Sequence, residues 1–310
     1  MEPVDARIHA LARQQHGVLS VAQVRRLGLR RDEIATRVRR GEFRSLWRGV
    51  VLIDADMYDE VPWVARVQGA LLRHGPDAVV GLGTAARLLG IAGADTPAEN
   101  VDVILPRGTE RQQVPGITLH FWQLDRAEID QRGAVRVTNA MRTLADLVPN
   151  LSRNPAVAAM DSALHQGLLS MADLTTARDL TGGRPYCRLA WEWWECADGR
   201  AESPLETWVR LDCHDHGLPP DELQWQVRNA SGDLLGVGDL AWVKRRRRPL
   251  VAEADGADPH STPRAVFGDR RRANNFVGAN VDIIRLRWFE ARRAGRCAAV
   301  VHAALNADPS

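Results

Sequence analysis

Apolar positions along the first 54 residues predict three short helices and a hairpin. In three successive segments apolar residues recur three or four positions apart, and the second segment begins with the capping-box pair Ser20 and Gln23. The third segment, about residues 30–40, has a narrow apolar stripe with arginines on its other sides. Residues 43–53 then read as a short hairpin that turns at residues 47–49. This order is typical of a winged helix-turn-helix domain, whose third helix enters the major groove of DNA.

The rest of the chain alternates between helical and strand patterns. In the middle part, strands are expected at 101–105 and 117–122, and helices at 139–147 and 155–164. Residues 200–310 read as helix, strand, strand, strand, helix, strand and helix. The expected bounds of the first six of these elements are 204–217, 223–227, 234–242, 250–254, 263–277 and 281–286.

We therefore expect an α/β chain of the α+β multidomain type. Its 310 residues, of which 45% are hydrophobic, are enough for several separate cores. The expected domains are a winged helix-turn-helix domain over 1–55, an α/β middle domain with a linker over 56–195, and a C-terminal domain with an αβββαβ core over 196–310. The order of elements in the last domain is similar to the core of the restriction-endonuclease-like fold.

Positive charge is concentrated at the N-terminal end. The whole chain has a net charge of only +2, but residues 1–50 hold 11 arginines against five acidic residues. A local excess of this kind indicates a nucleic-acid surface. The alternative is that these arginines only solvate a helix face. The arginines expected to contact DNA in this part are Arg30, Arg31, Arg37, Arg40 and Arg48. In the C-terminal third, Arg272 and Arg285 are expected either to contact phosphates or to be partners of the acids there.

Three carboxylates lie inside strand-like sequence in the C-terminal third. Simple alternation puts Asp239 on the face of Val237 and Ala241, and puts Glu253 and Asp255 together on one face of the next strand. If the two strands pair, these acids converge. Clustered negative charge needs a compensating cation or proton, and carboxylate oxygens suit Mg²⁺ or Mn²⁺. The sequence therefore predicts a catalytic metal site.

Some of these acids also have a purely structural explanation. Glu206 lies three residues after Ser203, so it is expected to complete a capping box at a helix start. Asp255 precedes a glycine and fits a turn. Asp239 and Glu253 stand among apolar neighbours and have no such explanation, so these two are the expected metal ligands.

The N-terminal and middle parts resemble a large group of actinobacterial proteins related to the antitoxin of abortive-infection type IV toxin-antitoxin systems. The resemblance covers roughly residues 5–180. It rests on the winged-helix segment and on the motifs at 83–90 (GTAARLLG) and 137–146 (VTNAMRTLAD). It implies a DNA-binding regulatory module, with a toxin or another protein as a possible partner.

The C-terminal third resembles an uncharacterised nuclease-like family related to the very-short-patch mismatch repair endonuclease. The resemblance rests on ESPLE at 202–206, GLP at 217–219, GDLAW at 238–242, EADG at 253–256, His260, Asp269 and Arg272. In that superfamily, acids from the second and third core strands bind Mg²⁺, and a helix Glu often assists. Carried over, these are Asp239, Glu253 and Glu206, with His260 as a general acid or base.

The chain departs from that family pattern in two ways. The widespread E-x-K motif ends in a lysine that orients water or stabilises the transition state, and here Asp255 takes its place. The chain's single lysine is Lys244. Many relatives also have two adjacent histidines, whereas His260 is followed by Ser261. The resemblance therefore implies the fold more strongly than it implies turnover.

The expected function is DNA binding combined with Mg²⁺-dependent DNA cleavage. The first alternative is a non-enzymatic, antitoxin-like repressor with an inactive nuclease-like domain. The second is a nuclease-like domain that only binds a nucleic-acid structure or a partner protein. The start of the chain lacks the order of a secretory signal, no apolar run approaches roughly 20 residues, and the four cysteines are scattered. We expect a cytoplasmic protein with no membrane partner and no disulfide framework.

Overall fold

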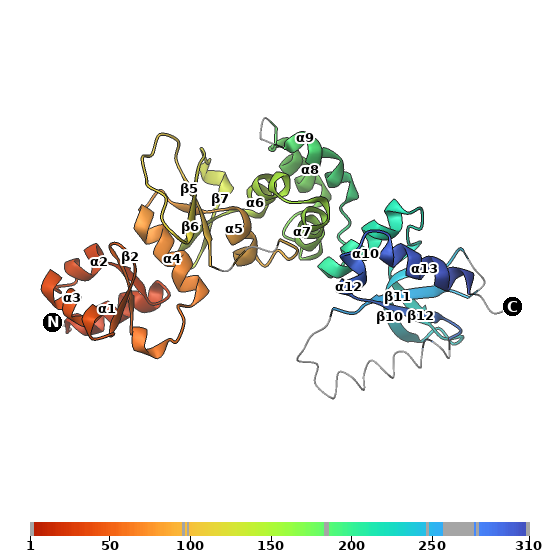
Figure 1. Cartoon of the computed structure of the whole chain (residues 1–310), viewed down its shortest axis with the longest axis horizontal. Coiled ribbons are helices and arrows are strands. Elements are labelled where there is room, and N and C mark those ends of the chain that lie inside the picture. Colours follow the sequence, from red (N-terminus) through yellow and green to blue (C-terminus); the bar gives the residue numbers. More distant parts are fainter. Residues whose placement is uncertain are drawn as a thin grey trace. The chain divides into compact units, whose positions relative to one another are not determined.

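A computed structural model describes residues 3–94, 97, 99–182, 186–245, 248–256, 276 and 279–307. The chain divides into two compact units. Unit 1 consists of residues 1–90 and 95–147, and unit 2 consists of residues 91–94 and 148–310. Three sheets with helices around them give a mixed α+β multidomain fold, as predicted (Figure 1). The finer division into three domains stays a prediction.

The N-terminal part of unit 1 contains the predicted helices and hairpin. Its elements are α1 (Val4–Gln14), β1 (Val18–Ser20), α2 (Val21–Arg26), α3 (Arg31–Arg39), β2 (Phe43–Trp47) and β3 (Val50–Ile53). The sequence did not predict β1, which pairs with β3 to give a sheet of order β1-β3-β2. The capping box is confirmed, since the Gln23 N–H donates to Ser20 Oγ at 3.1 Å and the Ser20 N–H donates to Gln23 Oε1 at 2.7 Å.

The remainder of unit 1 is built on a mixed sheet of order β6-β5-β4-β8-β7. Its elements are α4 (Trp63–His74), β4 (Val79–Val80), α5 (Leu82–Leu89), β5 (Val101–Leu105), β6 (Ile117–Phe121), β7 (Ile129–Arg132), β8 (Val135–Thr138) and α6 (Ala140–Leu147), with short 3-10 turns at Ala55–Met57 and Arg126–Glu128. The strand pairs β5/β6 and β4/β8 are parallel, and the other two neighbouring pairs are antiparallel.

A buried arginine holds this second part of unit 1 together. Arg142 on α6 is 5% exposed. Its Nε donates to Asp146 at 2.8 Å, and its Nη1 donates to Glu128 at 2.8 Å. These carboxylates raise the pKa of Arg142, against the opposing effect of its burial. The guanidinium therefore fixes the 3-10 turn that precedes β7 against α6.

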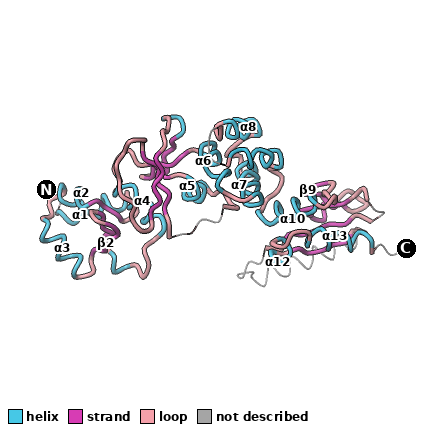
Figure 2. Tube along the Cα trace, turned by 45° about the horizontal axis from the view of Figure 1, so that its top comes forward, coloured by secondary structure: helices cyan, strands magenta, loops and turns pink. Residues whose placement is uncertain are grey.

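Unit 2 begins with helices and ends with the predicted strands. Its elements are α7 (Arg153–His165), α8 (Met171–Asp179), α9 (Cys187–Ala190), α10 (Pro204–Asp215), β9 (Glu222–Arg228), β10 (Leu234–Trp242), β11 (Leu250–Ala254), β12 (Asp282–Leu286), α12 (Trp288–Ala291) and α13 (Arg296–Asn306), with 3-10 turns at Val148–Asn150 and Trp191–Cys196. Figure 2 shows α12 and α13 beside the strands of this sheet. The expected helix over 263–277 lies outside the described residues, except for Phe276.

The sheet of unit 2 has the order β12-β11-β10-β9. Strand β10 pairs antiparallel with both β9 and β11, and β12 runs parallel to β11. Residues from α10, α12 and α13 form one apolar cluster with this sheet, centred on the fully buried Trp242. Helix α10 is also joined to α7, because Thr207 Oγ1 and Arg210 Nη2 donate to Asp161 at 2.7 and 2.8 Å.

Two further expectations can be compared with this structure. The four cysteines are free thiols, as expected from their spacing. Within the described ranges, no helix has both the length and the apolar character needed to cross a membrane.

The Arg142 network makes a stability prediction. Changing Arg142 to Met should lower the free energy of unfolding by about 3–5 kcal/mol, because the Asp146 side chain, which is fully buried, loses its charged partner. Changing Arg132, an exposed residue of β7, to Met should alter it by less than about 0.5 kcal/mol. Urea unfolding monitored by circular dichroism would measure both. Equal effects of the two changes would contradict the role given to Arg142.

Candidate functional site

The two strands expected to carry the catalytic acids are neighbours in the sheet. Residues of β10 and β11 pair antiparallel in the register Leu240↔Ala252. The next residue outward on each strand is one of the two expected ligands, Asp239 or Glu253. Asp239 also reaches across to β11, since its Oδ2 accepts a hydrogen bond from the Ala254 N–H at 2.8 Å. The strand pairing that the metal-site prediction required is therefore present.

The strand does not alternate regularly at Asp239. A side chain at Gly238 would meet Val251, the residue that packs in one apolar cluster with Ala241. Gly238 and Ala241 thus share a face although they are three residues apart, which regular alternation does not allow. The prediction that Asp239 lies on the common face of Val237 and Ala241 is wrong for this reason.

The irregularity coincides with an unusual backbone conformation in β9. The register pairs the neighbours of Gln224 with the neighbours of Asp239, so these two residues stand opposite each other. Gln224 has φ of 53°, in the left-handed region that a Gln rarely adopts. A strained residue of this kind marks candidate functional sites. Sequence analysis missed it, because no local signal distinguishes a Gln in this conformation from one in an ordinary strand.

The side chain of Gln224 connects this position to Glu206. Its Nε2 donates to Glu206 Oε2 at 2.9 Å, and the Glu202 N–H donates to the same oxygen at 2.9 Å. Only half of the expected capping box forms, because Ser203 Oγ accepts from the Glu206 N–H while the Glu206 carboxylate bonds to Glu202 instead. Glu206 is 6% exposed. It is a buried, hydrogen-bonded acid at the joint between α10 and β9.

Two arginines at or just after the end of β12 lie close to the acids at the end of β11. Arg285 Nε lies 3.3 Å from Glu253 Oε2, and the parallel register pairs the same two residues. Arg287 Nε lies 3.5 Å from Asp255 Oδ2. Asp255 follows the last residue of β11 and continues the pairing by donating its N–H to the Leu286 carbonyl at 2.8 Å. The negative charge of β11 is therefore balanced by neighbouring guanidinium groups.

The donor chemistry at this edge fits a hard cation. Asp239 and Glu253 offer carboxylate oxygens, the ligands that Mg²⁺ and Mn²⁺ prefer. Among the residues that the structure describes, no group of three or more His, Cys, Asp and Glu is arranged to hold a metal ion. Two other expected site residues, His260 and Arg272, lie outside the described residues. The single lysine, Lys244, is exposed and follows β10.

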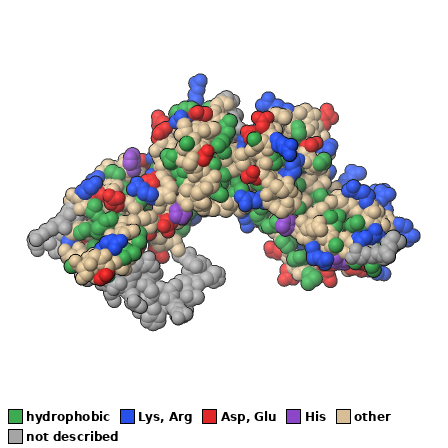
Figure 3. All heavy atoms as spheres, turned by 180° about the vertical axis from the view of Figure 1, so that it is seen from behind, with side chains coloured by type: hydrophobic (Ala, Val, Ile, Leu, Met, Phe, Trp, Pro, Cys, Tyr) green, Lys and Arg blue, Asp and Glu red, His purple; other side chains and the backbone are tan. Residues whose placement is uncertain are grey.

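The arginines expected on the winged-helix surface fall into two kinds. Arg37 is 24% exposed in its side chain, bonds to Asp5 at 2.7 Å and lies over the ring of Phe43. It therefore ties α3 to α1. The others are exposed: Arg30, Arg31, Arg40 and Arg48. Two of them also form surface ion pairs, Arg30 with Asp32 and Glu33, and Arg40 with Glu42. Figure 3 shows Lys and Arg side chains gathered on this N-terminal part of the surface.

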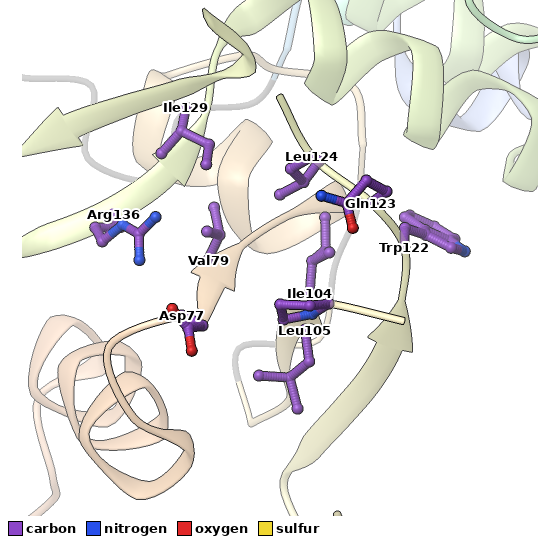
Figure 4. Close-up of a pocket in the computed structure, with 10 residues that line it drawn as sticks. Asp77, Val79, Ile104, Leu105, Trp122, Gln123, Leu124, Ile129 and Arg136 are labelled. Atoms are coloured by element: carbon purple, nitrogen blue, oxygen red, sulfur yellow. The ribbon is translucent and has the colours of Figure 1, made fainter. Parts of the chain in front are cut away.

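Unit 1 also contains a small pocket that the sequence did not indicate. It has a volume of about 170 Å³ and lies between the end of β6 and the strands β4, β5 and β8 (Figure 4). Its lining is mostly apolar, and its charged residues are Asp77 and Arg136. Asp77 and Arg136 together do not make a set of groups that suggests catalysis.

Comparisons with known proteins identify relatives without an assigned activity. No family model matches the chain. It is 29% identical over 270 residues to the uncharacterised proteins MT2308 and Rv2248 of two Mycobacterium tuberculosis strains, a match that covers 87% of this chain and 94% of each relative. The crystal structure of the Rv2827c protein of Mycobacterium tuberculosis matches 72% of this chain and 83% of its own, with a TM-score of 0.42 and 14% identity.

The contact between Gln224 and Glu206 can be tested by its effect on stability. Gln224→Met keeps an L side chain at the strained position but removes the donor to a buried carboxylate, so the free energy of unfolding should fall by about 1–3 kcal/mol. Gln226→Met, on the exposed side of the same strand, is the matched control and should have little effect. If chemical denaturation showed the same small change for both, the Glu206 contact would be energetically unimportant.

Proposed function

We propose that this protein binds duplex DNA through its N-terminal winged-helix part and cuts or nicks DNA with Mg²⁺ or Mn²⁺ in its C-terminal part. The observation that carries the proposal is the pairing of β10 with β11, which brings Asp239 and Glu253 to adjacent positions beyond the Leu240↔Ala252 pair. These acids come from the second and third strands of this sheet, which are the strands implied by the resemblance to restriction-endonuclease-like proteins. A cytoplasmic location is part of the proposal.

The residues around the paired ends of β10 and β11 would have separate roles in phosphodiester hydrolysis. Asp239 and Glu253 would hold the metal, which when bound lowers the pKa of a water molecule and offsets charge on the phosphate. Glu206, held by Gln224, would orient the neighbouring groups from the joint between α10 and β9. His260 remains the proposed general acid or base.

Arg285 would take over part of the role of the missing lysine. In the E-x-K pattern a cation stands near the second acid, and here Asp255 occupies the lysine position. The Arg285 guanidinium lies 3.3 Å from Glu253 and can reach a negatively charged oxygen from the adjacent strand. A positive group therefore accompanies Glu253, although it comes from β12 rather than from β11.

One observation favours the alternative of a non-enzymatic, antitoxin-like repressor. Glu253 and Asp255 are each already paired with an arginine, so their charges are balanced without a metal. A fold that had lost its activity would retain such ion pairs. In this alternative the winged-helix part would bind operator DNA, and the C-terminal part would bind a toxin or another protein partner.

Cleavage by the purified full chain distinguishes the two functions. With millimolar Mg²⁺ or Mn²⁺, the protein should nick supercoiled DNA or cut one of a panel of mismatched, branched and single-stranded substrates. The product should disappear in EDTA and fall by at least about 100-fold in Glu253→Gln and Asp239→Asn, since the metal stabilises charge that develops during the reaction.

The control for that experiment is the Glu222→Gln variant, which changes a half-buried acid at the start of β9 and should cut like the wild type. Both site variants should still bind DNA. Product that is equal in wild type and Glu253→Gln, or absent from every substrate, would leave the repressor as the better function.

DNA binding should depend on the exposed arginines rather than on Arg37. Changing Arg40 and Arg48 together to Ala should weaken duplex binding and reduce the slope of log affinity against log salt by roughly 0.9 per lost phosphate contact. Arg13→Ala, an exposed change on α1, should leave both unchanged. Fluorescence anisotropy over a salt series measures these quantities. An unaltered slope in the double variant would mean that these arginines only solvate the surface.

A further inference from the structure

A larger pocket in unit 1 lies where the winged-helix part meets the middle α/β part. Its walls come from α2, from α4 and the turn that follows it, and from the start of β8. Its volume is about 540 Å³. Small-molecule sites in proteins commonly measure roughly 300–1,000 Å³. This pocket therefore has the size of a ligand site, and the residues of the proposed nuclease site do not line it.

The charged lining of this pocket is entirely positive. Arg26 of α2 and Arg136 of β8 line it, and no acidic side chain does. Within the described part of the chain, the side chain of Arg26 has neither an ion-pair partner nor a hydrogen-bond partner. Arg136 donates to the Pro76 carbonyl and forms no ion pair with any described carboxylate. The arginines near Glu253, in contrast, are paired with acids. A pocket with two uncompensated guanidinium groups attracts an anion.

A buried amide supplies an independent indication of a ligand. Gln68 of α4 lines the pocket and is 4% exposed, yet its Oε1 has no hydrogen-bond partner in the protein. A buried acceptor without a donor is unfavourable, and such groups are rare in folded proteins. The lining also includes apolar side chains, among them Leu71, Leu72 and Ala134. A suitable ligand therefore combines an anionic group, a hydrogen-bond donor and an apolar body.

We infer that this pocket is a binding site for a small organic acid, an apolar carboxylate that carries a hydroxyl donor. The carboxylate lies against Arg26 and Arg136, because guanidinium groups match the geometry of a carboxylate. The hydroxyl donates to Gln68 Oε1, and the apolar body contacts the leucines of α4. This inference does not rest on DNA binding or on cleavage.

Calorimetric titration of the full chain tests the site. The probes are 4-hydroxybenzoate and 6-hydroxy-2-naphthoate, with 2-naphthoate lacking the donor and 6-hydroxy-2-naphthamide lacking the charge. A hydroxy acid should bind saturably at one site, and both comparison compounds should bind at least about tenfold more weakly. Arg26→Gln should weaken hydroxy-acid binding about tenfold or more, since it removes a charged donor. Arg25→Gln, an exposed neighbour on α2 outside the pocket, should leave binding unchanged.

Two further variants keep the inference falsifiable. Gln68→Leu should abolish the preference for the hydroxylated acid over 2-naphthoate, while it retains or raises the Tm because it removes the unpartnered amide. Arg136→Gln should weaken binding, and its Tm shows whether the loss of the Pro76 contact has unfolded it. The inference is overturned if neither hydroxy acid binds saturably, if the amide binds as tightly as the acid, or if Arg26→Gln and Arg25→Gln behave alike.

Discussion

The buried carboxylates are the constraint on which the internal packing of each unit depends. An ionised acid in an apolar interior is strongly unfavourable unless charged or hydrogen-bonding partners surround it. Each buried acid of the described residues has such partners, and most come from another segment of the chain. The pairs are Asp102 with Thr84 and His120, Asp146 with Arg142, Asp161 with Thr207 and Arg210, Glu206 with Gln224, and Asp212 with the N–H groups of Gly295 and Ala298. Removing a partner therefore affects the packing of two elements together.

The acids at the edge of β10 and β11 are held differently. Asp239 and Glu253 are only partly buried, and their partners among the described residues include the Ala254 N–H and the Arg285 guanidinium group. Carboxylates that stay accessible at the meeting point of two strands can exchange these partners for a cation at lower cost than fully enclosed acids can. This difference in burial is the physical reason for proposing the metal site at Asp239 and Glu253, with the more deeply buried Glu206 in a supporting position.

Arginine performs two distinct tasks in this chain. The same residue type closes internal networks at Arg142 and Arg37, and stands exposed at Arg40 and Arg48. The exposed kind can exchange solvent and counterions for phosphate oxygens at low cost, since the one ion pair of these two residues among the described side chains is a long surface contact between Arg40 and Glu42 at 3.9 Å. Arg26 and Arg136 form a third group, because both line a pocket without an ion-pair partner among the described acids. The role of each arginine therefore depends on the groups that its guanidinium contacts, and not on its being an arginine.

Local signals in the sequence were sufficient for most elements of secondary structure and for the two strands that carry Asp239 and Glu253. Capping at Ser20 and the strand-like apolar residues of 234–242 and 250–254 act between neighbours in the chain, so they can be read from the sequence alone. The tertiary structure decided the rest. Three features involve a partner at least 15 residues away in the chain. Gln224, with its left-handed backbone, bonds to Glu206; Asp239, where the strand stops alternating, bonds to Ala254; and Arg37 bonds to Asp5. No local pattern records such a partner, because the register of distant segments is set only when their apolar faces pack together.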